Sequence, residues 1–111
     1  MAIKGNLEAL ILGVLTSGPL HGYAIARAIE ERGGGLLKMG ENQLYPALHK
    51  LEREGQVEAE WQPQENKPPR KVYSLTEAGT GALAKYKKEW EKYASSVSAI
   101  LGSMPTEAQH G

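Results

Sequence analysis

The longest periodic feature of this chain is a run of bulky apolar residues toward its C-terminal end. Its members are separated by steps of three and four residues in alternation, and they are Leu83, Tyr86, Trp90, Tyr93, Val97, Ile100 and Met104. This spacing places all of them on one stripe of an α-helix about 32 Å long. One helix cannot cover its own stripe of aromatic rings, so we expect a second copy of the chain to cover it. The stripe therefore predicts a dimerisation helix.

The boundaries of this helix are also predicted. Thr76 is a good N-cap, Glu77 complements the helix dipole in the first turn, and Pro105 is expected to end the helix. The chain is therefore expected to divide into a first part over residues 1–75, a helix over 76–105 and a flexible tail over 106–111.

The composition of the whole chain restricts the class of protein that it can be. With 111 residues, 41% of them apolar and 23% charged, the chain suits one modest globular domain with an appendage. The absence of cysteine excludes disulfides and thiolate metal sites and suits a reducing cytoplasm. No apolar run is long enough for a membrane helix and no signal peptide is recognisable, so we expect no membrane partner. The three histidines lack metal-ligand spacing, and we expect no metal and no cofactor.

Charge limits the kind of nucleic-acid site that is possible. Thirteen basic residues balance thirteen acidic residues, so the formal net charge is zero. A binding site for nucleic acid would therefore be a local basic patch rather than a polycationic tail.

Two short helices are predicted near the beginning of the chain. Asn6 can cap a helix with an apolar stripe over residues 7–15, which Ser17, Gly18 and Pro19 stop. A second helix follows the corner at Gly22 and ends at the three glycines of residues 33–35.

A third helix is expected to begin around Asn42 or Gln43 and to end at Gly55. Its inward stripe is Leu44, Leu48 and Leu51, and Pro46 is tolerable if it lies near the first turn.

The period then changes from that of a helix to that of a strand. Val57, Ala59 and Trp61 alternate with Glu58 and Glu60. Lys71, Tyr73 and Leu75 alternate with Val72 and Ser74. This two-residue period predicts two half-buried strands, with Trp61 on the inward side together with Val57. Residues 62–69 contain prolines at 63, 68 and 69, and predict a long, stiff, polar tip.

This order of elements predicts a mainly α fold with a small β-hairpin, namely a winged helix-turn-helix over residues 1–75. In this architecture the third helix enters the major groove of double-stranded DNA and the hairpin reaches the backbone. The expected outward positions of the third helix are Asn42, Gln43, Tyr45, Ala47, His49, Lys50 and Arg53, with Pro46 beside them. Further DNA contacts are expected from Lys67, Arg70 and Lys71 of the hairpin and from Lys4 and Lys38 on its flanks.

Three segments resemble one known family. They are Leu20-His21-Gly22-Tyr23, the stretch from Leu44 to Gly55 that begins Leu-Tyr-Pro-Ala-Leu, and the stretch from Arg70 to Gly79 with its Tyr-x-Leu-Thr-x-x-Gly element. Together they resemble the PadR-type transcriptional regulators over roughly residues 5–80. The resemblance implies a homodimeric bacterial repressor that binds a palindromic operator and is released by a small molecule. The single short C-terminal helix is similar to the compact subgroup of that family, in which this helix makes the dimer and multidrug-responsive members occur.

Several aromatic and histidine side chains have two interpretations. Trp90, with Tyr86 and Tyr93, either lines a cleft for flat aromatic effectors, as the resemblance suggests, or forms a packed dimer core. Tyr45 either touches phosphate through its hydroxyl or packs its ring against the wing, and both can hold together. For His49 we expect a DNA contact, whereas His21 suits a local hydrogen bond and His110 lies in the tail.

Catalysis is not expected, because the chain has no glycine-rich loop between a strand and a helix and no nucleophile with a base at motif spacing. The interpretation that competes with a DNA-binding repressor is a winged-helix module that makes only protein contacts, which the zero net charge makes conceivable.

Overall fold

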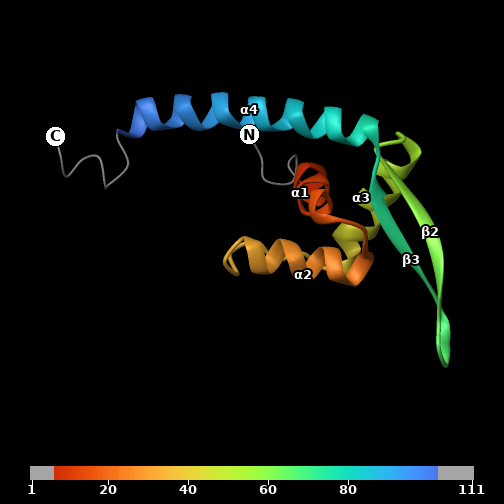
Figure 1. Cartoon of the computed structure of the whole chain (residues 1–111). Helices are drawn as coiled ribbons and strands as arrows, with labels where there is room; N and C mark the ends of the chain where they lie inside the picture. Colours follow the sequence, from red (N-terminus) through yellow and green to blue (C-terminus); the bar gives the residue numbers. More distant parts are fainter. Residues whose placement is uncertain (1–6, 103–111) are drawn as a thin grey trace.

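The computed structural model describes residues 7–102, which form four α-helices and a three-stranded antiparallel sheet (Figure 1). In chain order the elements are α1 (Leu7–Val14), the 3-10 turn η2 (Leu15–Ser17), β1 (Leu20–His21), α2 (Gly22–Arg32), α3 (Glu41–Arg53), β2 (Val57–Gln64), β3 (Lys67–Leu75) and α4 (Glu77–Leu101). This order confirms the predicted winged helix-turn-helix with a long C-terminal helix. None of the helices in the described part combines the length and apolar character needed to cross a bilayer.

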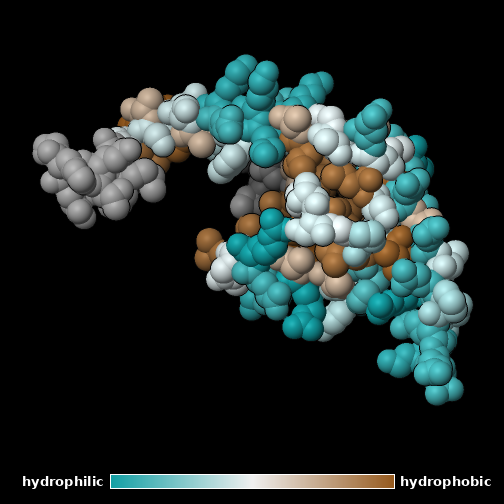
Figure 2. Space-filling view, in the orientation of Figure 1, coloured by the Kyte–Doolittle hydropathy of each residue, from teal (hydrophilic) through white to brown (hydrophobic). Residues whose placement is uncertain are grey.

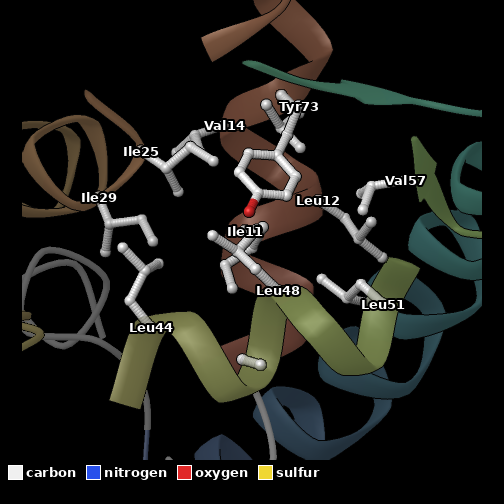
Figure 3. Close-up of a cluster of buried hydrophobic side chains, with 12 residues drawn as sticks. Ile11, Leu12, Val14, Ile25, Ile29, Leu44, Leu48, Leu51, Val57 and Tyr73 are labelled. Atoms are coloured by element: carbon white, nitrogen blue, oxygen red, sulfur yellow. The ribbon is translucent and has the colours of Figure 1, made fainter. Parts of the chain in front are cut away.

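The core lies where α1, α2 and α3 meet under the base of the sheet (Figure 3). The helices contribute apolar side chains such as Ile11, Ile25 and Leu48, and the sheet adds those of Val57 and Tyr73. Tyr23, which the periodicity places on the apolar stripe of α2, is instead 62% exposed. Tyr73 is only 2% exposed, and its ring reaches from β3 into the space between the helices. Each fully buried side chain of this size stabilises the fold by about 1.5–3 kcal/mol relative to leaving it exposed. This core holds α3 in a fixed position beneath the sheet.

The sheet has a strand that the sequence did not indicate. β1 pairs with β3 through Leu20 and His21, opposite Tyr73 and Val72, so the strand order is β1-β3-β2. A two-residue strand is too short to produce an alternating pattern, and only its partner strand defines it.

The tip of the hairpin is polar and exposed as predicted, but most of its residues belong to the two strands rather than to a loop. β2 and β3 continue to a two-residue turn at Glu65 and Asn66, and Asn66 has a φ of 58°. Asparagine tolerates this left-handed conformation. Pro63 is accommodated because the pairing register shifts between Gln62 and Gln64. Pro68 and Pro69 are accommodated because β1 pairs with β3 only at Val72 and Tyr73, so the tip half of β3 has β2 as its one neighbour among the described strands.

The base of α4 is fixed against the turn that precedes β2. The Thr76 hydroxyl oxygen accepts a hydrogen bond from the Gly79 N–H at 3.0 Å, which confirms the predicted cap. The Thr76 N–H donates to the Gln56 carbonyl at 3.2 Å. A side chain at Gly79 would collide with that same carbonyl, so this close approach requires glycine.

The far end of α4 differs from the prediction. The helix ends at Leu101, where Gly102 takes a φ of 100°, and therefore before Pro105. Glycine adopts a positive φ without steric cost, which makes it an effective helix terminator. Lys4, Asn6, Met104, Pro105 and His110 all lie outside the described residues.

The arrangement in space separates two parts. The α1–α3 helices and the sheet form one body, and α4 runs across α1 and projects beyond the body (Figure 1). The hairpin of β2 and β3 extends away from the body in another direction.

Candidate nucleic-acid interface

The exposed face of α3 is a line of side chains opposite the buried stripe. Asn42, Pro46, His49 and Arg53 follow one another along this line and all are exposed. Their spacing of three and four residues keeps them on one side of the helix, turned away from Leu44, Leu48 and Leu51. Amide, imidazole and guanidinium groups of this kind can hydrogen-bond to base edges and phosphates.

Ala47 does not belong to this exposed face, so the expectation that it points outward is wrong. Its side chain is only 8% exposed. It follows Leu44 by three residues and precedes Leu51 by four, so helix geometry places it on the buried stripe.

Near the beginning of α3, a proline leaves one backbone carbonyl oxygen on the exposed face without its usual hydrogen-bond donor. The helix starts at Glu41, and the Gln43 side chain accepts a hydrogen bond from the Gly40 N–H at 3.4 Å. Pro46 therefore lies in the second turn rather than the first. It has no N–H to donate, which leaves the carbonyl of Asn42 without its usual partner inside the helix.

Tyr45 packs against the start of α2 rather than against the wing. Its side chain is half-buried, and a Cβ on Gly22 would lie 2.8 Å from its hydroxyl oxygen. The glycine in the His-Gly-Tyr segment is thus required by the tyrosine of the Leu-Tyr-Pro segment.

The basic residues of the hairpin point in different directions. Lys67 and Arg70 are exposed, whereas the Lys71 ammonium lies 3.2 Å from a carboxylate oxygen of Glu52. Adjacent residues of a strand face opposite sides of the sheet, so Arg70 and Lys71 cannot serve one surface. On the Arg70 side lies His21, whose pKa is lowered first by burial and second by the charge of Arg70. Lys38, ahead of α3, is exposed.

Trp61 is exposed at the surface, which the alternating pattern of β2 did not predict. It was expected on the inward side of β2, but its side chain is 68% exposed. The described helices do not cover this part of β2, because the hairpin extends beyond them (Figure 1). The Lys71 ammonium lies 5.9 Å from its ring centre and 5.7 Å from that of Tyr73. These contacts, with Glu52, hold Lys71 between the hairpin and α3.

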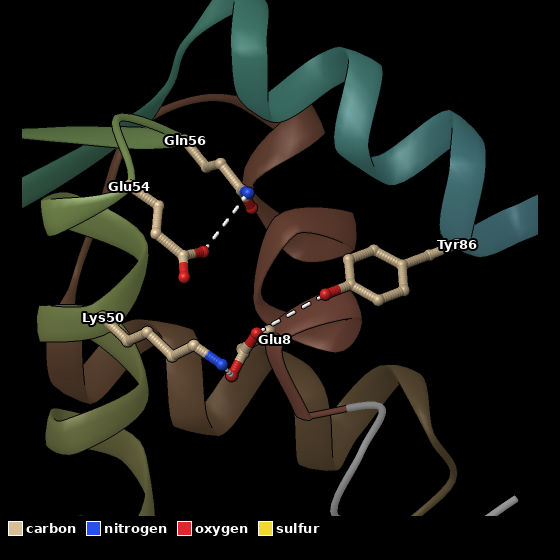
Figure 4. A network of polar contacts seen from close by, with 5 residues as sticks. All are labelled: Glu8, Lys50, Glu54, Gln56 and Tyr86. Carbon is tan, nitrogen blue, oxygen red and sulfur yellow. Dashed lines mark hydrogen bonds and ion pairs between the residues drawn. The ribbon is translucent and has the colours of Figure 1, made fainter.

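A carboxylate on α1 connects α3 with α4 (Figure 4). One oxygen of Glu8 lies 3.2 Å from the ammonium of Lys50, and the other accepts a hydrogen bond from the Tyr86 hydroxyl at 3.4 Å. The hydrogen bond to Glu8 and its charge raise the pKa of Lys50. Burial, followed by the Glu8 charge, raises the pKa of Tyr86. No sequence pattern identified Glu8, because its two partners are distant in the chain.

The predicted apolar stripe of α4 divides into two parts. Leu83 and Tyr86 pack against the body of their own chain. Farther along, Trp90 is 51% exposed and Ile100 is 82% exposed, with Tyr93 and Leu101 also exposed and Val97 half-buried. Figure 2 shows apolar surface on this projecting part and a hollow between it and the body.

The three aromatic residues of the stripe do not form one group. The ring centres of Trp90 and Tyr93 are 5.8 Å apart, and the rings are tilted by 36°. Tyr86 instead points its hydroxyl toward Glu8 (Figure 4). Within residues 7–102 no cluster of three or more acidic or histidine side chains could hold a metal ion.

A helix with an exposed polar face, a hairpin beside it and a long helix leading away define a winged helix-turn-helix protein. Residues 11–85 match the model of the transcriptional regulator PadR-like family. The chain therefore belongs to the PadR-like family, whose members are transcriptional regulators and not enzymes.

Individual relatives agree with this assignment. Uncharacterized protein X of Lysinibacillus sphaericus is 30% identical over 88 residues, which are 79% of this chain and 81% of that protein. The negative transcriptional regulator PadR of Bacillus subtilis is 37% identical over 77 residues, which are 69% of this chain. The match spans only 42% of that regulator, and only 21% of a protein from transposon TN4556 of Streptomyces fradiae.

Solved structures show the same fold. A transcriptional regulator from Clostridium thermocellum superposes with a TM-score of 0.82 at 26% identity, covering 90% of this chain and 97% of the other. Bacillus subtilis PadR in complex with operator DNA superposes with a TM-score of 0.67 at 35% identity, covering 72% of this chain and 44% of the other.

Proposed function

We propose that this protein is a homodimeric repressor that binds a palindromic DNA operator and is released by a flat aromatic small molecule. The observation that carries the proposal is the combination of two exposed surfaces on one small fold. One is the polar line along α3, and the other is the apolar stripe on the projecting part of α4. Neither surface is needed to stabilise the body.

In the proposed complex α3 lies in the major groove. Asn42, His49 and Arg53 reach base edges, where asparagine suits adenine and arginine suits guanine. The flanks of α3 and the wing contact phosphates through Gln43, Tyr45, Lys38, Lys67 and Arg70, joined by Lys4. Lys50 is left out of this set because Glu8 already holds its ammonium. The operator complex of Bacillus subtilis PadR supports DNA as the partner by similarity.

The proposed dimer buries the exposed stripe of α4 on a second copy. Leu83 and Tyr86 anchor the helix to its own body, and Trp90, Tyr93, Val97 and Ile100 face the partner. The heptad spacing assigns Met104, which lies outside the described residues, to the same interface. A two-fold axis would set the two α3 helices about one duplex turn apart, roughly 34 Å, which matches a palindromic site. Negative regulation by the Bacillus subtilis relative supports a repressor, and DNA as partner implies a cytoplasmic protein.

Salt dependence of DNA binding tests this function. An operator is first selected from random duplex DNA with the full chain, and its affinity is then measured at several salt concentrations. The logarithm of the association constant should fall linearly with the logarithm of salt, by about 0.9 for each phosphate neutralised. Absence of binding to any DNA at low salt would favour the competing protein-contact module.

The effector cleft is tested separately with tryptophan fluorescence. The chain has two tryptophans, so a Trp61→Phe variant leaves Trp90 as the only indole emitter. We expect planar cationic dyes to quench Trp90, because two copies of the ring near the axis can stack on a flat cation. If quenching is absent up to the solubility limit of the dye, Trp90 is only a packed part of the dimer core.

A further inference from the structure

Glu8 lies between α3, the proposed DNA-reading helix, and α4, the proposed dimerisation helix, and can fix the orientation of one relative to the other. It belongs to α1, yet its two carboxylate oxygens contact Lys50 of α3 and Tyr86 of α4 (Figure 4). Its side chain is 22% exposed and that of Tyr86 is half-buried, whereas Lys50 is exposed, so solvent screens the contact with Tyr86 less than the ion pair with Lys50.

Contacts at the first turn of α4 are not enough to define the direction of the helix. At its first turn, Thr76 and Gly79 fix α4 to the chain at Gln56. A helix that is attached only at its first turn can still tilt relative to the body. Leu101 lies 22 residues beyond Gly79, or about 33 Å along the helix, so a tilt of about 5° would move it by about 3 Å. A second point of attachment is needed to define where the partner sits.

Tyr86 supplies that second point about 10 Å beyond Gly79. The apolar packing of Leu83 and of the Tyr86 ring holds α4 close to the body but is not directional. A hydrogen bond is directional, and the contacts of Glu8 run to both helices whose relative orientation sets the geometry of the dimer.

We propose that Glu8 is a positioning residue, which fixes the direction of α4 relative to α3 and thereby the separation of the two reading helices in the dimer. This inference rests on the proposed dimeric, DNA-binding function. Lys50 then acts through Glu8, in place of the DNA contact that the sequence predicted for it.

The separation can be measured without DNA. The chain contains no cysteine, so Ser17→Cys at an exposed position of the body accepts one spin label per subunit. In the otherwise unaltered dimer, pulsed electron double resonance should give a narrow distance distribution between labels. Adding Glu8→Gln should broaden it at least about twofold, because the tilt of α4 is no longer fixed.

Two further variants separate positioning from general destabilisation. Tyr86→Phe removes only the hydroxyl and keeps the packed ring, so it should broaden the distribution in the same way while the protein remains folded. Glu31→Gln makes the same chemical change at an exposed ion pair with Arg27 and should leave the distribution narrow. Narrow distributions in both Glu8→Gln and Tyr86→Phe would overturn the inference. Absence of any dipolar signal in the unaltered labelled protein would overturn the dimer, and the inference with it.

Operator spacing gives an independent readout. The selected operator is lengthened or shortened by one base pair between its half-sites. The unaltered protein should discriminate against both changes, and Glu8→Gln and Tyr86→Phe should reduce that discrimination about 5- to 10-fold. A uniform loss of affinity with spacing discrimination intact would indicate a merely structural role and contradict the proposal.

Discussion

At the scale of single residues, the position of α3 against α2 depends on Gly22. A Cβ there would lie 2.8 Å from the Tyr45 hydroxyl oxygen and 2.9 Å from its Cε1, so the ring would have to move. We expect Gly22→Ala to lower the free energy of unfolding by about 1–3 kcal/mol, measured by urea denaturation.

The matched control for this change is Gly13→Ala. Gly13 also lies in a helix, but a Cβ there meets no atom within 4 Å. Alanine favours a helix over glycine by up to about 1 kcal/mol, so this variant should be equally or more stable. Equal unfolding free energies for the two variants would contradict the packing of Tyr45 on Gly22.

His21 should make stability depend on pH. Burial and then the charge of Arg70 lower the pKa of its imidazole, so the unfolded chain binds more protons once the pH falls toward the unfolded pKa. The stabilisation is complete above the unfolded pKa and is lost as the pH falls through the folded pKa. Urea denaturation between about pH 8 and about pH 5 should show this decline.

His21→Gln should flatten that decline, while His49→Gln, at an exposed position on α3, should preserve it. A decline that persists unchanged in His21→Gln would assign the pH dependence to other groups.

Arg70 and Lys71 are neighbours with different roles. Arg70 is exposed, whereas Lys71 is held by Glu52 and two aromatic rings. We expect Arg70→Ala to weaken operator binding by about 1–3 kcal/mol and to reduce the salt slope by about one. Lys71→Met should leave the salt slope unchanged. A reduced slope in both variants would mean that the Lys71 ammonium leaves Glu52 to contact phosphate.

At the scale of elements, local patterns predicted the helices and strands but not their contacts. The stripes of α1, α2 and α3 repeat within the chain, and the Thr76 cap depends on the next three residues only, so both were readable. β1 and the full length of the hairpin depend on pairing between distant strands, which periodicity does not encode.

The same distinction applies to the candidate site. The exposed face of α3 follows from helix geometry, but of the positions expected to point outward Ala47 is buried and Tyr45 is half-buried against α2. The attachments of Lys50 to Glu8 and of Lys71 to Glu52 join residues far apart in the chain, so the sequence alone gave both lysines as free cations.

The outer part of α4 should be dispensable for folding and necessary for assembly. Replacing both Tyr93 and Val97 with Glu would bury unpaired charge in the proposed interface, so we expect monomers in sedimentation velocity. The body should remain folded, because its core includes neither residue.

A double substitution on the exposed side of the same helix, Ser95→Glu with Ser98→Glu, adds the same charge and should leave the dimer intact. A dimer that survives replacement of Tyr93 and Val97 would refute the assignment of this stripe to the interface.

At the scale of the whole molecule, the fold divides into a body that carries α3 and an arm that projects from it (Figure 1). The arm is attached at its base through Gly79 and again through Tyr86, and its free part begins one turn later at Trp90. A ligand bound between the Trp90 side chains of a dimer would therefore act next to the link to α3. This connection gives the proposed effector a physical route to the reading helices.

The stoichiometry of the complex with selected operator DNA tests the central claim most directly. Analytical ultracentrifugation of a labelled palindromic duplex, with increasing amounts of the full chain, gives the number of chains bound to each duplex. We predict two chains per duplex, bound together, with no lasting species of one chain and one duplex. Binding of single chains to isolated half-sites with undiminished affinity, or no binding at low salt, would contradict the account.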